Sequence, residues 1–338
     1  MKILQPPHAH GITGGFLFNR RLADASKGAI TVETVEGPAL ASALQRASRE
    51  PRFLDSLFLR DPRTVSALEA LAPRSWRGVG WLLHSAPTAR TLERAAFRVV
   101  PGEWMARHLR GAGVRKEITV LVPGVDRAFV RVRERRIARP TTEAPRLLTV
   151  ANAHPGKGLI EGLRALAALP TPWRWAIAGS WETEPDYARA FEAEARALGV
   201  HDRIERLGTV APDVILRELS SADVFLLPSR FENQSLAVLE AVAAGVPILT
   251  TRTGENATWV LDHLTGRLVD AGAGMEDELR AAVGEILADP VTLGRYERNS
   301  ARAPVPVGTW EQAAQAWIDR FSPGDRRARR ADGSSAST

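Results

Sequence analysis

The feature that most constrains the fold is a repeated alternation of short apolar runs with helical segments. The apolar runs predict buried strands, and the segments between them have the spacing of amphipathic helices. Expected strands lie at residues 2–4, 29–33, 53–59, 78–84, 97–100, 118–122, 146–150, 175–178, 204–207, 224–227, 248–251 and 266–270. A crossover between parallel strands needs a connecting helix, so this alternation builds parallel sheets. The sequence therefore predicts an α/β protein with two doubly wound, Rossmann-like parallel-sheet domains.

The expected helices fall between these strands. They lie at residues 16–25, 103–111, 158–169, 187–198, 213–220, 235–244, 256–261 and 276–287, with a terminal amphipathic helix at 310–321. Glycine or proline ends several of them, as at Gly245 and Pro247, which favours short loops leading into the next strand.

A change in composition suggests where the domains meet. Residues 131–145 are Arg-rich and then contain Pro, Thr and Glu, which predicts a linker. We therefore expect an N-terminal domain at 1–140 and a C-terminal domain at 141–305. The terminal helix within 306–322 is expected to pack back across the domains. The Gly-, Arg- and Ser-rich tail at 323–338 is expected to be disordered.

Composition excludes several classes of protein. The chain has 338 residues, of which 44% are hydrophobic and 25% charged, as in ordinary globular proteins of two domains. It has no cysteine, which excludes disulfides, cysteine-ligated zinc and thiol catalysis. No apolar run approaches the roughly 18 to 20 residues that span a bilayer. The first residues lack the pattern of a signal peptide, so we expect a cytoplasmic protein.

Charge is distributed unevenly along the chain. Residues 1–140 carry 24 Lys and Arg against 12 Asp and Glu, whereas residues 141–322 carry 17 against 25. A basic half attracts anions, such as anionic lipid, a phosphorylated acceptor or nucleic acid. The arginines closest together in sequence are Arg90, Arg94, Arg98, Arg107, Arg110 and Arg115. The alternative is a solvated arginine surface. No recognition motif accompanies these charges, so no nucleic-acid partner is expected.

The segment from Pro228 to Thr250 carries the clearest chemical signal. It places Glu232 in a loop at the carboxyl end of a predicted strand, where open α/β sheets bind ligands. The backbone amides of Ser235 and Leu236 then lie at a helix N-terminus, which suits a phosphate. Such a site can hold a sugar and a ribose with two carboxylates and a diphosphate with amides. The alternative is one more strand–loop–helix unit with incidental acids.

This segment resembles the Glu-x7-Glu signature of the retaining family 4 glycosyltransferases, with Glu232 and Glu240 as its two acids. Other segments resemble parts of the same family in the same order. They are the early glycines Gly14 and Gly15, the strand that ends at His84, the loop that ends at Lys157, and the turn at Gly208 and Thr209. The resemblance covers nearly the whole chain and is strongest over residues 146–270.

The resemblance implies the GT-B architecture, with a cleft between two domains and transfer of a sugar from a nucleotide diphosphate donor with retention of configuration. By the same resemblance, Glu232 binds sugar hydroxyls and Glu240 binds the ribose. Lys157 and the amides at Ser235 and Leu236 bind the diphosphate.

The remaining roles also come from the resemblance, which with the basic N-terminal half implies an anionic or lipid-linked acceptor and peripheral contact with a membrane. The backbone at Gly208 and Thr209 reads the base of the donor. His84 contacts the acceptor, and Gly15 lets the backbone approach a phosphate or the acceptor closely. Lys157, His84 and Glu232 are the expected catalytic residues.

One position departs from the family pattern. Asn152 stands where the family has a donor-binding arginine that partners the lysine, so one positive charge is missing. This leaves open a degenerate, non-catalytic GT-B module that binds a nucleotide-sugar or a partner. A sugar-nucleotide epimerase is a further alternative, against which the Glu-x7-Glu context argues. We expect no cofactor and no metal, since His8 and His10 lack nearby acidic partners.

Overall fold

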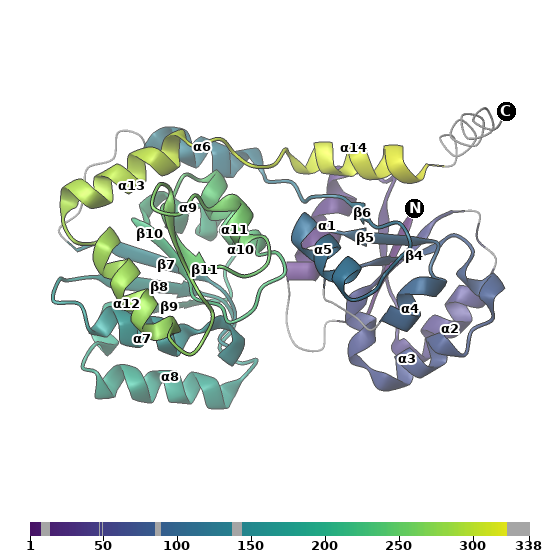
Figure 1. Ribbon diagram of the computed structural model, residues 1–338, viewed down its shortest axis with the longest axis horizontal. Helices are drawn as coiled ribbons and strands as arrows, with labels where there is room; N and C mark the ends of the chain where they lie inside the picture. Colours follow the sequence, from purple (N-terminus) through teal and green to yellow (C-terminus); the bar gives the residue numbers. More distant parts are fainter. Residues whose placement is uncertain (8–13, 47, 49, 85–88, 137–143, 323–338) are drawn as a thin grey trace. The chain divides into compact units, whose positions relative to one another are not determined.

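The computed structural model describes residues 1–338 except 8–13, 47, 49, 85–88, 137–143 and 323–338, and it leaves the side chains of residues 89–91 undescribed (Figure 1). The chain divides into two compact units. Unit 1 comprises Met1–Gly124 together with the segment that begins at Val307, and unit 2 comprises Val125–Pro306. Two expectations concern residues outside the described ranges. They are the absence of a metal at His8 and His10 and the disorder of the tail at 323–338.

Unit 1 is built on a six-stranded parallel sheet in the order β2-β1-β3-β4-β5-β6. Its strands are β1 (Lys2–Gln5), β2 (Thr31–Thr34), β3 (Arg52–Asp55), β4 (Val79–Leu82), β5 (Phe97–Val100) and β6 (Thr119–Val120). Its helices are α1 (Gly14–Ala25), α2 (Gly37–Gln45), α3 (Pro62–Glu69), α4 (Ala89–Arg94), α5 (Glu103–Gly111) and α14 (Trp310–Phe321). The central strands β3 and β4 are buried along their whole length, as expected of a parallel sheet covered on both faces.

The terminal helix α14 belongs to unit 1, where it packs against α1. The rings of Trp317 and Phe321 contact Phe53 of β3, with ring centroids 5.1 and 4.8 Å apart. Gly124 permits this packing, since a Cβ there would lie 2.2 Å from the backbone nitrogen of Trp310. Thr309 and Gln312 form a capping box that fixes the start of the helix.

Unit 2 contains a second six-stranded parallel sheet, in the order β12-β11-β10-β7-β8-β9. Its strands are β7 (Arg146–Val150), β8 (Arg174–Ala178), β9 (Ile204–Gly208), β10 (Val224–Leu227), β11 (Ile248–Thr251) and β12 (Gly266–Val269). Its helices are α6 (Arg127–Arg136), α7 (Leu159–Ala167), α8 (Pro185–Ala197), α9 (Pro212–Ser221), α10 (Leu236–Ala243), α11 (Asn256–Trp259), α12 (Met275–Ile286) and α13 (Pro290–Arg302).

Helices cover both faces of the unit 2 sheet (Figure 1). Helix α7 packs against α8 and α12, and α6 packs against α9, α10 and α13. One hydrophobic core joins buried side chains of α7, α8, α12 and α13 to the strands, including Trp175, Phe191, Leu226 and Leu279. The predicted fold class, two doubly wound parallel sheets, is confirmed.

The predicted domain boundary at residue 140 is wrong, because residues 127–136 form helix α6 within unit 2. The arginines that suggested a linker hold the helix in place. Arg133 is 8% exposed, and its guanidinium donates to the carbonyls of Val242 and Ser300 at 2.9 and 3.0 Å. Arg136 donates to Leu219 O at 2.9 Å. These carbonyls lie in the last turns of helices α10, α13 and α9, where a cation interacts favourably with the exposed carbonyl ends of a helix.

Two further expectations about elements are corrected. The predicted strand at 53–59 ends at Asp55, and a 3-10 helix (Ser56–Arg60) follows it. The Asp55 carboxylate ends the strand because it accepts a hydrogen bond from Leu57 N at 2.8 Å and so caps the turn. Helices α3 and α13 were not predicted. Each starts at an Asp-Pro pair, with Asp61 or Asp289 as N-cap and proline as the first helical residue.

Within the described residues, no helix is long and apolar enough to cross a membrane.

Candidate functional site

The order of strands in unit 2 locates a binding crevice. From β7 the chain proceeds outward through β8 and β9 on one side, and from β10 through β11 and β12 on the other. The connections therefore reverse direction between β7 and β10. Loops at the carboxyl ends of two such strands lead away from each other and leave a crevice where ligands bind. Lys157 follows β7 and Glu232 follows β10, so both predicted catalytic residues of this unit come from the two strands at the reversal.

The loop after β7 is held against the end of β10. It turns through a short 3-10 helix at Pro155–Lys157, which begins where His154 Nδ1 accepts a hydrogen bond from Gly156 N at 2.9 Å. Gly158 has φ of 64°, and a Cβ there would lie 2.0 Å from Pro228 O. Only glycine combines this conformation with so close an approach. The Lys157 side chain is thereby placed next to the loop that follows β10.

Glu232 lies at the centre of a small polar cluster. Its side chain is 10% exposed, and its Oε1 accepts hydrogen bonds from Lys157 Nζ at 2.6 Å and from Ser229 Oγ at 2.7 Å. Burying a carboxylate is costly unless it is paired and hydrogen-bonded, and both conditions are met here. The two residues predicted from separate motifs, 75 positions apart in the chain, are thus in direct contact. Arg230, between Ser229 and Phe231, pairs instead with Glu161.

Helix α10 starts directly after this loop, as predicted. Ser235 is its N-cap and accepts a hydrogen bond from Val238 N at 3.3 Å, and Leu236 is the first helical residue. Its first amides carry partial positive charge, which suits an anion. Glu240 lies on the same helix and is half-buried. The loop after β11 supports this start, because Glu255 N donates to Asn233 O at 3.0 Å.

The remaining predicted donor residues lie at the ends of β7 and β9. The Asn152 side chain has a structural contact, because Oδ1 accepts a hydrogen bond from Ser180 N at 2.9 Å and ties together the loops after β7 and β8. Gly208 ends β9 with φ of 68°, and its carbonyl accepts from Gly179 N at 2.8 Å. Thr209 follows it and is exposed. Asn152, Gly208 and Thr209 thus share the carboxyl edge of the sheet with Lys157.

Unit 1 has a reversal of its own. Its strand order places β1 between β2 and β3, so the connections change direction between β1 and β3. His84 follows β4, and Gly15 lies in the first turn of α1. A Cβ at Gly15 would lie 3.0 Å from His84 Cδ2, so the predicted pair is in contact. Gly15 is helical rather than in the predicted loop, because α1 starts at Gly14.

His84 is packed in a largely buried setting. Its side chain is 12% exposed, its ring packs edge-on against Phe18 with centroids 5.0 Å apart, and its backbone N donates to Ser56 Oγ at 2.9 Å. Burial lowers the pKa of His84 because it disfavours the charged imidazole, and the nearby Asp55 carboxylate opposes this shift.

The sequence analysis missed three polar residues beside His84: Gln5, Asn19 and Asp55 are all buried. Asn19 Nδ2 donates to Gln5 Oε1 at 3.1 Å and to Asp55 Oδ2 at 2.6 Å, and Asn19 Oδ1 lies 3.2 Å from His84 Nε2. One sequence feature could have identified two of them, because Gln5 and Asp55 are polar residues at the ends of apolar strands.

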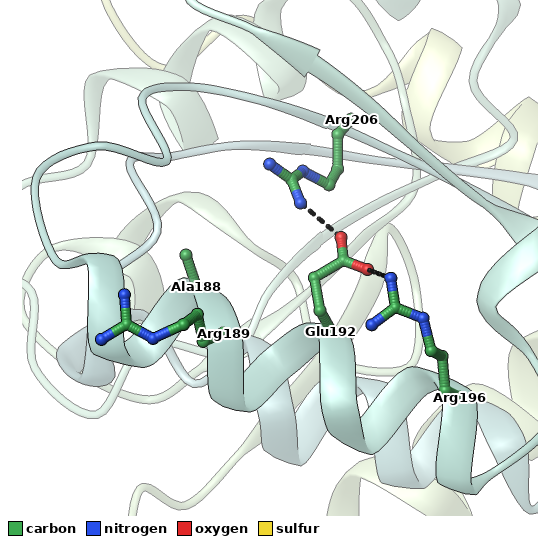
Figure 2. A pocket seen from close by; sticks show the side chains of 5 residues that line it. All are labelled: Ala188, Arg189, Glu192, Arg196 and Arg206. Atoms are coloured by element: carbon green, nitrogen blue, oxygen red, sulfur yellow. Dashed lines mark hydrogen bonds and ion pairs between the residues drawn. The ribbon is translucent and has the colours of Figure 1, made fainter.

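A surface pocket elsewhere on unit 2 is lined by Ala188, Arg189, Glu192, Arg196 and Arg206 (Figure 2). The Glu192 carboxylate pairs with both Arg196 and Arg206, so the positive charge of the pocket is partly neutralised (Figure 2). Its residues come from the middle of α8 and of β9 rather than from the carboxyl edge of the sheet. We therefore place the candidate site at the β7–β10 crevice. In the part of the chain that is described, no three His, Asp or Glu side chains cluster as metal ligands would.

Comparison with known proteins shows what this chain is similar to. Residues 144–289 match the sequence model of the family described as "Glycosyl transferases group 1". A D-inositol 3-phosphate glycosyltransferase of Xylanimonas cellulosilytica is 32% identical over 212 residues, which cover 61% of this chain and 48% of the relative. A GDP-mannose-dependent alpha-(1-6)-phosphatidylinositol monomannoside mannosyltransferase of Mycolicibacterium smegmatis is 29% identical, covering 68% of this chain and 63% of the relative. The chain spans about half the length of the first curated relatives it matches.

Solved structures share the fold across almost the whole chain. Anabaena HepE in complex with UDP and glucose superimposes with a TM-score of 0.74 at 17% identity, covering 95% of this chain and 99% of HepE. A sucrose-phosphate synthase from Thermosynechococcus elongatus gives 0.73 at 19% identity, covering 98% and 99%. At this level of identity the likeness concerns the fold, which is the GT-B fold that the sequence analysis expected.

Proposed function

We propose that this chain, whose residues 144–289 match the model of the glycosyl transferases group 1 family, transfers a sugar from a nucleotide diphosphate donor to an acceptor. The observation that carries the proposal is the contact between Lys157 and Glu232 at the reversal of the unit 2 sheet. A cation and a carboxylate meet there beside the N-terminus of α10. A nucleotide-sugar needs these three features together, because it carries a diphosphate next to a polyhydroxylated ring.

The donor is held by unit 2. Lys157 and the first amides of α10, at Ser235 and Leu236, stabilise the diphosphate and the charge that develops on it as it leaves. Glu240 accepts hydrogen bonds from the ribose hydroxyls, since a carboxylate is an acceptor at both oxygens. Relatives and structural neighbours support the donor class: one is named as GDP-mannose-dependent and another was crystallised with UDP-glucose.

Glu232 contacts hydroxyls of the transferred sugar. Its Oε1 accepts hydrogen bonds from Lys157 and Ser229, and the contact from Ser229 holds the carboxylate in position independently of the lysine. Fixed dipoles and charges stabilise a transition state without reorganisation at the moment of reaction. We propose retention of configuration, with the acceptor attacking the face from which the diphosphate departs and a donor phosphate oxygen taking its proton. The positive charge comes from Lys157 and helix α10, without a metal ion.

The acceptor is contacted by unit 1 through His84 and the backbone near Gly15. The names of two relatives point to anionic acceptors, namely inositol phosphate and a phosphatidylinositol mannoside. Side chains of unit 1 that fit an anion are the exposed Arg94, Arg107, Arg110 and Arg115. Arg98, expected among them, is 4% exposed and donates to the carbonyls of Leu92, Ala95 and Glu117, so it supports the fold instead.

A lipid-phosphate acceptor implies peripheral contact with an anionic membrane, for which each nearby basic side chain contributes about 1 kcal/mol. Co-sedimentation with vesicles of anionic or neutral lipid, at low and moderate salt, measures this contact. We expect binding to the anionic vesicles alone, weakened by salt because the Debye length shortens. Equal binding to both kinds of vesicle, or binding to neither, would reject the membrane contact and favour a soluble acceptor.

The proposed activity is tested in two steps with the full chain. The first is a thermal-unfolding panel with UDP-, GDP- and ADP-sugars, because a ligand that binds only the folded state raises its stability. The second is release of the nucleoside diphosphate in the presence of candidate acceptors, followed by NMR assignment of the anomeric configuration in the product.

We expect one nucleotide class to raise Tm and to be turned over with retention. The missing charge at Asn152 motivates the alternative of a non-catalytic binding module, which predicts a rise in Tm without turnover, and without hydrolysis, for every acceptor. A panel in which no nucleotide-sugar raises Tm contradicts both functions.

A further inference from the structure

The buried polar cluster of unit 1 lies at that unit's own sheet reversal. Gln5 ends β1 and Asp55 ends β3, the two strands between which the connections change direction, while Asn19 comes from α1 and His84 follows β4. Asn19 and Asp55 have no exposed surface, and Gln5 is 6% exposed. Four polar side chains brought together from four elements, deep in the fold, are unusual because each must find a partner to offset its loss of water.

Asn19 is the centre of this cluster. Its Nδ2 donates to Gln5 Oε1 at 3.1 Å and to Asp55 Oδ2 at 2.6 Å. Its Oδ1 lies 3.2 Å from His84 Nε2. The Asp55 carboxylate and His84 Nε2 are themselves 3.9 Å apart, which is beyond hydrogen-bond length. The amide of Asn19 therefore takes the place of a direct contact between the acid and the imidazole.

The chemistry of the three groups decides where the proton lies. A carboxylate only accepts hydrogen bonds, so Asp55 requires the NH2 group of Asn19. The Asn19 carbonyl oxygen is then the atom that faces His84, and it too only accepts. His84 must therefore carry its proton on Nε2. The charge of Asp55 thus sets the orientation of Asn19, and the orientation of Asn19 sets the tautomer of His84.

We propose that Asn19 is a positioning residue for the transfer reaction, a neutral spacer that keeps His84 uncharged and in the Nε2–H tautomer beside the Asp55 carboxylate. This inference rests on the proposed function, in which His84 contacts the acceptor. Nδ1 of such an imidazole is an acceptor, so it suits a group that donates, such as a sugar hydroxyl. An imidazolium would favour a phosphate or a carboxylate instead.

The surroundings of His84 fit a neutral ring. The side chains of α1 that face it, Phe18 and Asn19, are uncharged, and the neutral hydroxyl of Ser56 accepts from the backbone N of His84. Among the described residues, Asp55 is the charged group that acts on it. A direct pair with a carboxylate raises the pKa of a histidine, whereas burial lowers it. By separating the two groups, Asn19 lets burial dominate.

The first test is made on the unaltered full chain with nitrogen-15 labelled histidine. Long-range proton–nitrogen spectra distinguish the two neutral tautomers and the imidazolium, and the variant His84→Gln identifies the signals of His84 among the 7 histidines. We expect the Nε2–H pattern at pH 7 and a titration midpoint below the ordinary value of about 6.5. An Nδ1–H pattern, or a midpoint above that value, overturns the proposal.

The second test separates a spacer from a residue that merely fills space. Asn19→Leu removes the amide, so the Nε2–H group of His84 becomes the donor available to the Asp55 carboxylate. We expect its protonation constant to rise at least tenfold, with an equal shift of the acid limb of the kcat/KM profile. The same change in an Asp55→Asn background should give no rise, because the carboxylate that attracts the proton is gone. Equal effects in the two backgrounds overturn the proposal.

If Asn19→Leu does not fold, the single variant Asp55→Asn still tests the proposal. A neutral amide at this position no longer dictates the orientation of Asn19, so the nitrogen signals of His84 should move to values between the two tautomers. Unchanged signals overturn the proposal. All these spectra are read without turnover, so a chain that transfers no sugar still reports on Asn19. The spectra and the kinetics can also disagree. If the spectra change as expected but the acid limb of the kcat/KM profile is the same in all variants, Asn19 is still a spacer, and His84 does not contact the acceptor.

Discussion

At the scale of single residues, the contact between Lys157 and Glu232 does two things. It offsets the loss of hydration of a nearly buried carboxylate, and it holds the lysine at the β7–β10 crevice. A diphosphate brings negative charge to the same lysine and therefore competes with Glu232 for it. We infer that donor binding loosens the ion pair, while the hydrogen bond from Ser229 Oγ keeps the carboxylate in position for the sugar hydroxyls. Lys157 is 31% exposed, so an anion reaches it without unfolding the loop.

Glu232→Gln should lower kcat by about 100-fold or more, the usual effect of losing one preorganised transition-state contact. The fold should survive, because the amide oxygen still accepts from Ser229 Oγ. Steady-state kinetics with the preferred donor provide the measurement. Glu134→Gln, an exposed acid on α6, is the matched control. A Glu232→Gln variant that turns over within about a factor of two of the parent would show that Glu232 has no such role.

Glu240→Ala should weaken donor binding rather than slow the chemical step. Ribose contacts are made equally in the ground and transition states, so their loss raises KM and leaves kcat nearly unchanged. Removing a charge-assisted hydrogen bond costs roughly 1.5 to 3 kcal/mol. Titration calorimetry with the nucleoside diphosphate should therefore show a Kd raised about 10- to 150-fold. Unchanged affinity would remove Glu240 from the donor site.

His84 predicts a dependence of stability on pH. Because burial lowers its pKa in the folded state, the unfolded chain takes up the proton at a higher pH. Its contribution is therefore fully present above the unfolded pKa of about 6.5 and is lost as pH falls from there toward the folded pKa. Urea unfolding between pH 8 and pH 5 should show a smaller loss in His84→Gln than in the parent. Equal losses in both chains would place the folded pKa at its ordinary value.

The residues that sequence alone could predict are those with a fixed spacing. Glu232, Lys157 and His84 each follow an apolar strand at a distance that a motif specifies, and the structure places each of them at a sheet reversal or beside one. Asn19 could not be found this way, because one polar residue in an amphipathic helix is ordinary. Asn152 was placed correctly in the loop after β7, but sequence could not reveal that its carbonyl oxygen is used by Ser180 N.

At the scale of elements, helix α6 shows why an arginine-rich segment can be predicted wrongly as a linker. Segments rich in charge usually remain solvated, so residues 131–145 suggested a linker. In the structure the side chains of Arg133 and Arg136 lie along buried surface and end on helix carbonyls. Which charged side chains find such partners depends on tertiary contacts with residues more than 80 positions away. The alternating strands, by contrast, were predictable because their signal is local.

Arg133→Met should destabilise unit 2 by about 2 to 4 kcal/mol. The substitution keeps the apolar stem but removes the guanidinium donor from the carbonyls of Ser300 and Ala303, while Val242 O keeps its hydrogen bond from Gly245 N. Buried acceptors without partners cost about 1 to 3 kcal/mol each. The matched control is Arg131→Met on the exposed side of the same helix, expected to change stability by less than about 0.5 kcal/mol. Denaturant unfolding measures both. Equal, small effects would mean that α6 is not anchored through Arg133.

At the scale of the whole molecule, a boundary at Gly124 changes how the net charge divides between the two units. Residues 125–140 carry six arginines and two acids, so four net positive charges pass from the N-terminal to the C-terminal part. Two of those arginines are buried against helix ends and cannot meet a ligand. Unit 1 remains basic, but less so than the sequence division implied. Within unit 1, the residues that we expect to attract an anionic acceptor are exposed arginines before Gly124, such as Arg107 and Arg110 on α5.

The revised boundary predicts which fragment of this chain folds on its own. Unit 2 is contiguous in sequence, contains a complete sheet with helices on both faces, and holds Lys157, Glu232 and Glu240 together. We expect residues 125–306 to unfold cooperatively and to bind the nucleoside diphosphate with nearly the affinity of the full chain. The fragment 141–305, cut at the boundary that composition suggested, lacks α6.

Without α6, the fragment 141–305 exposes the surfaces of α9, α10 and α13 that the helix covers, and it loses the donors of Arg133 and Arg136. Exposed apolar surface and unsatisfied helix ends both lower stability. We therefore expect a lower Tm and weaker binding than for residues 125–306, as measured by circular dichroism and calorimetry. Adding Arg133→Met to the longer fragment should reproduce part of this loss. Equal stability of the two fragments would mean that α6 contributes nothing to unit 2 and that the boundary belongs nearer residue 140.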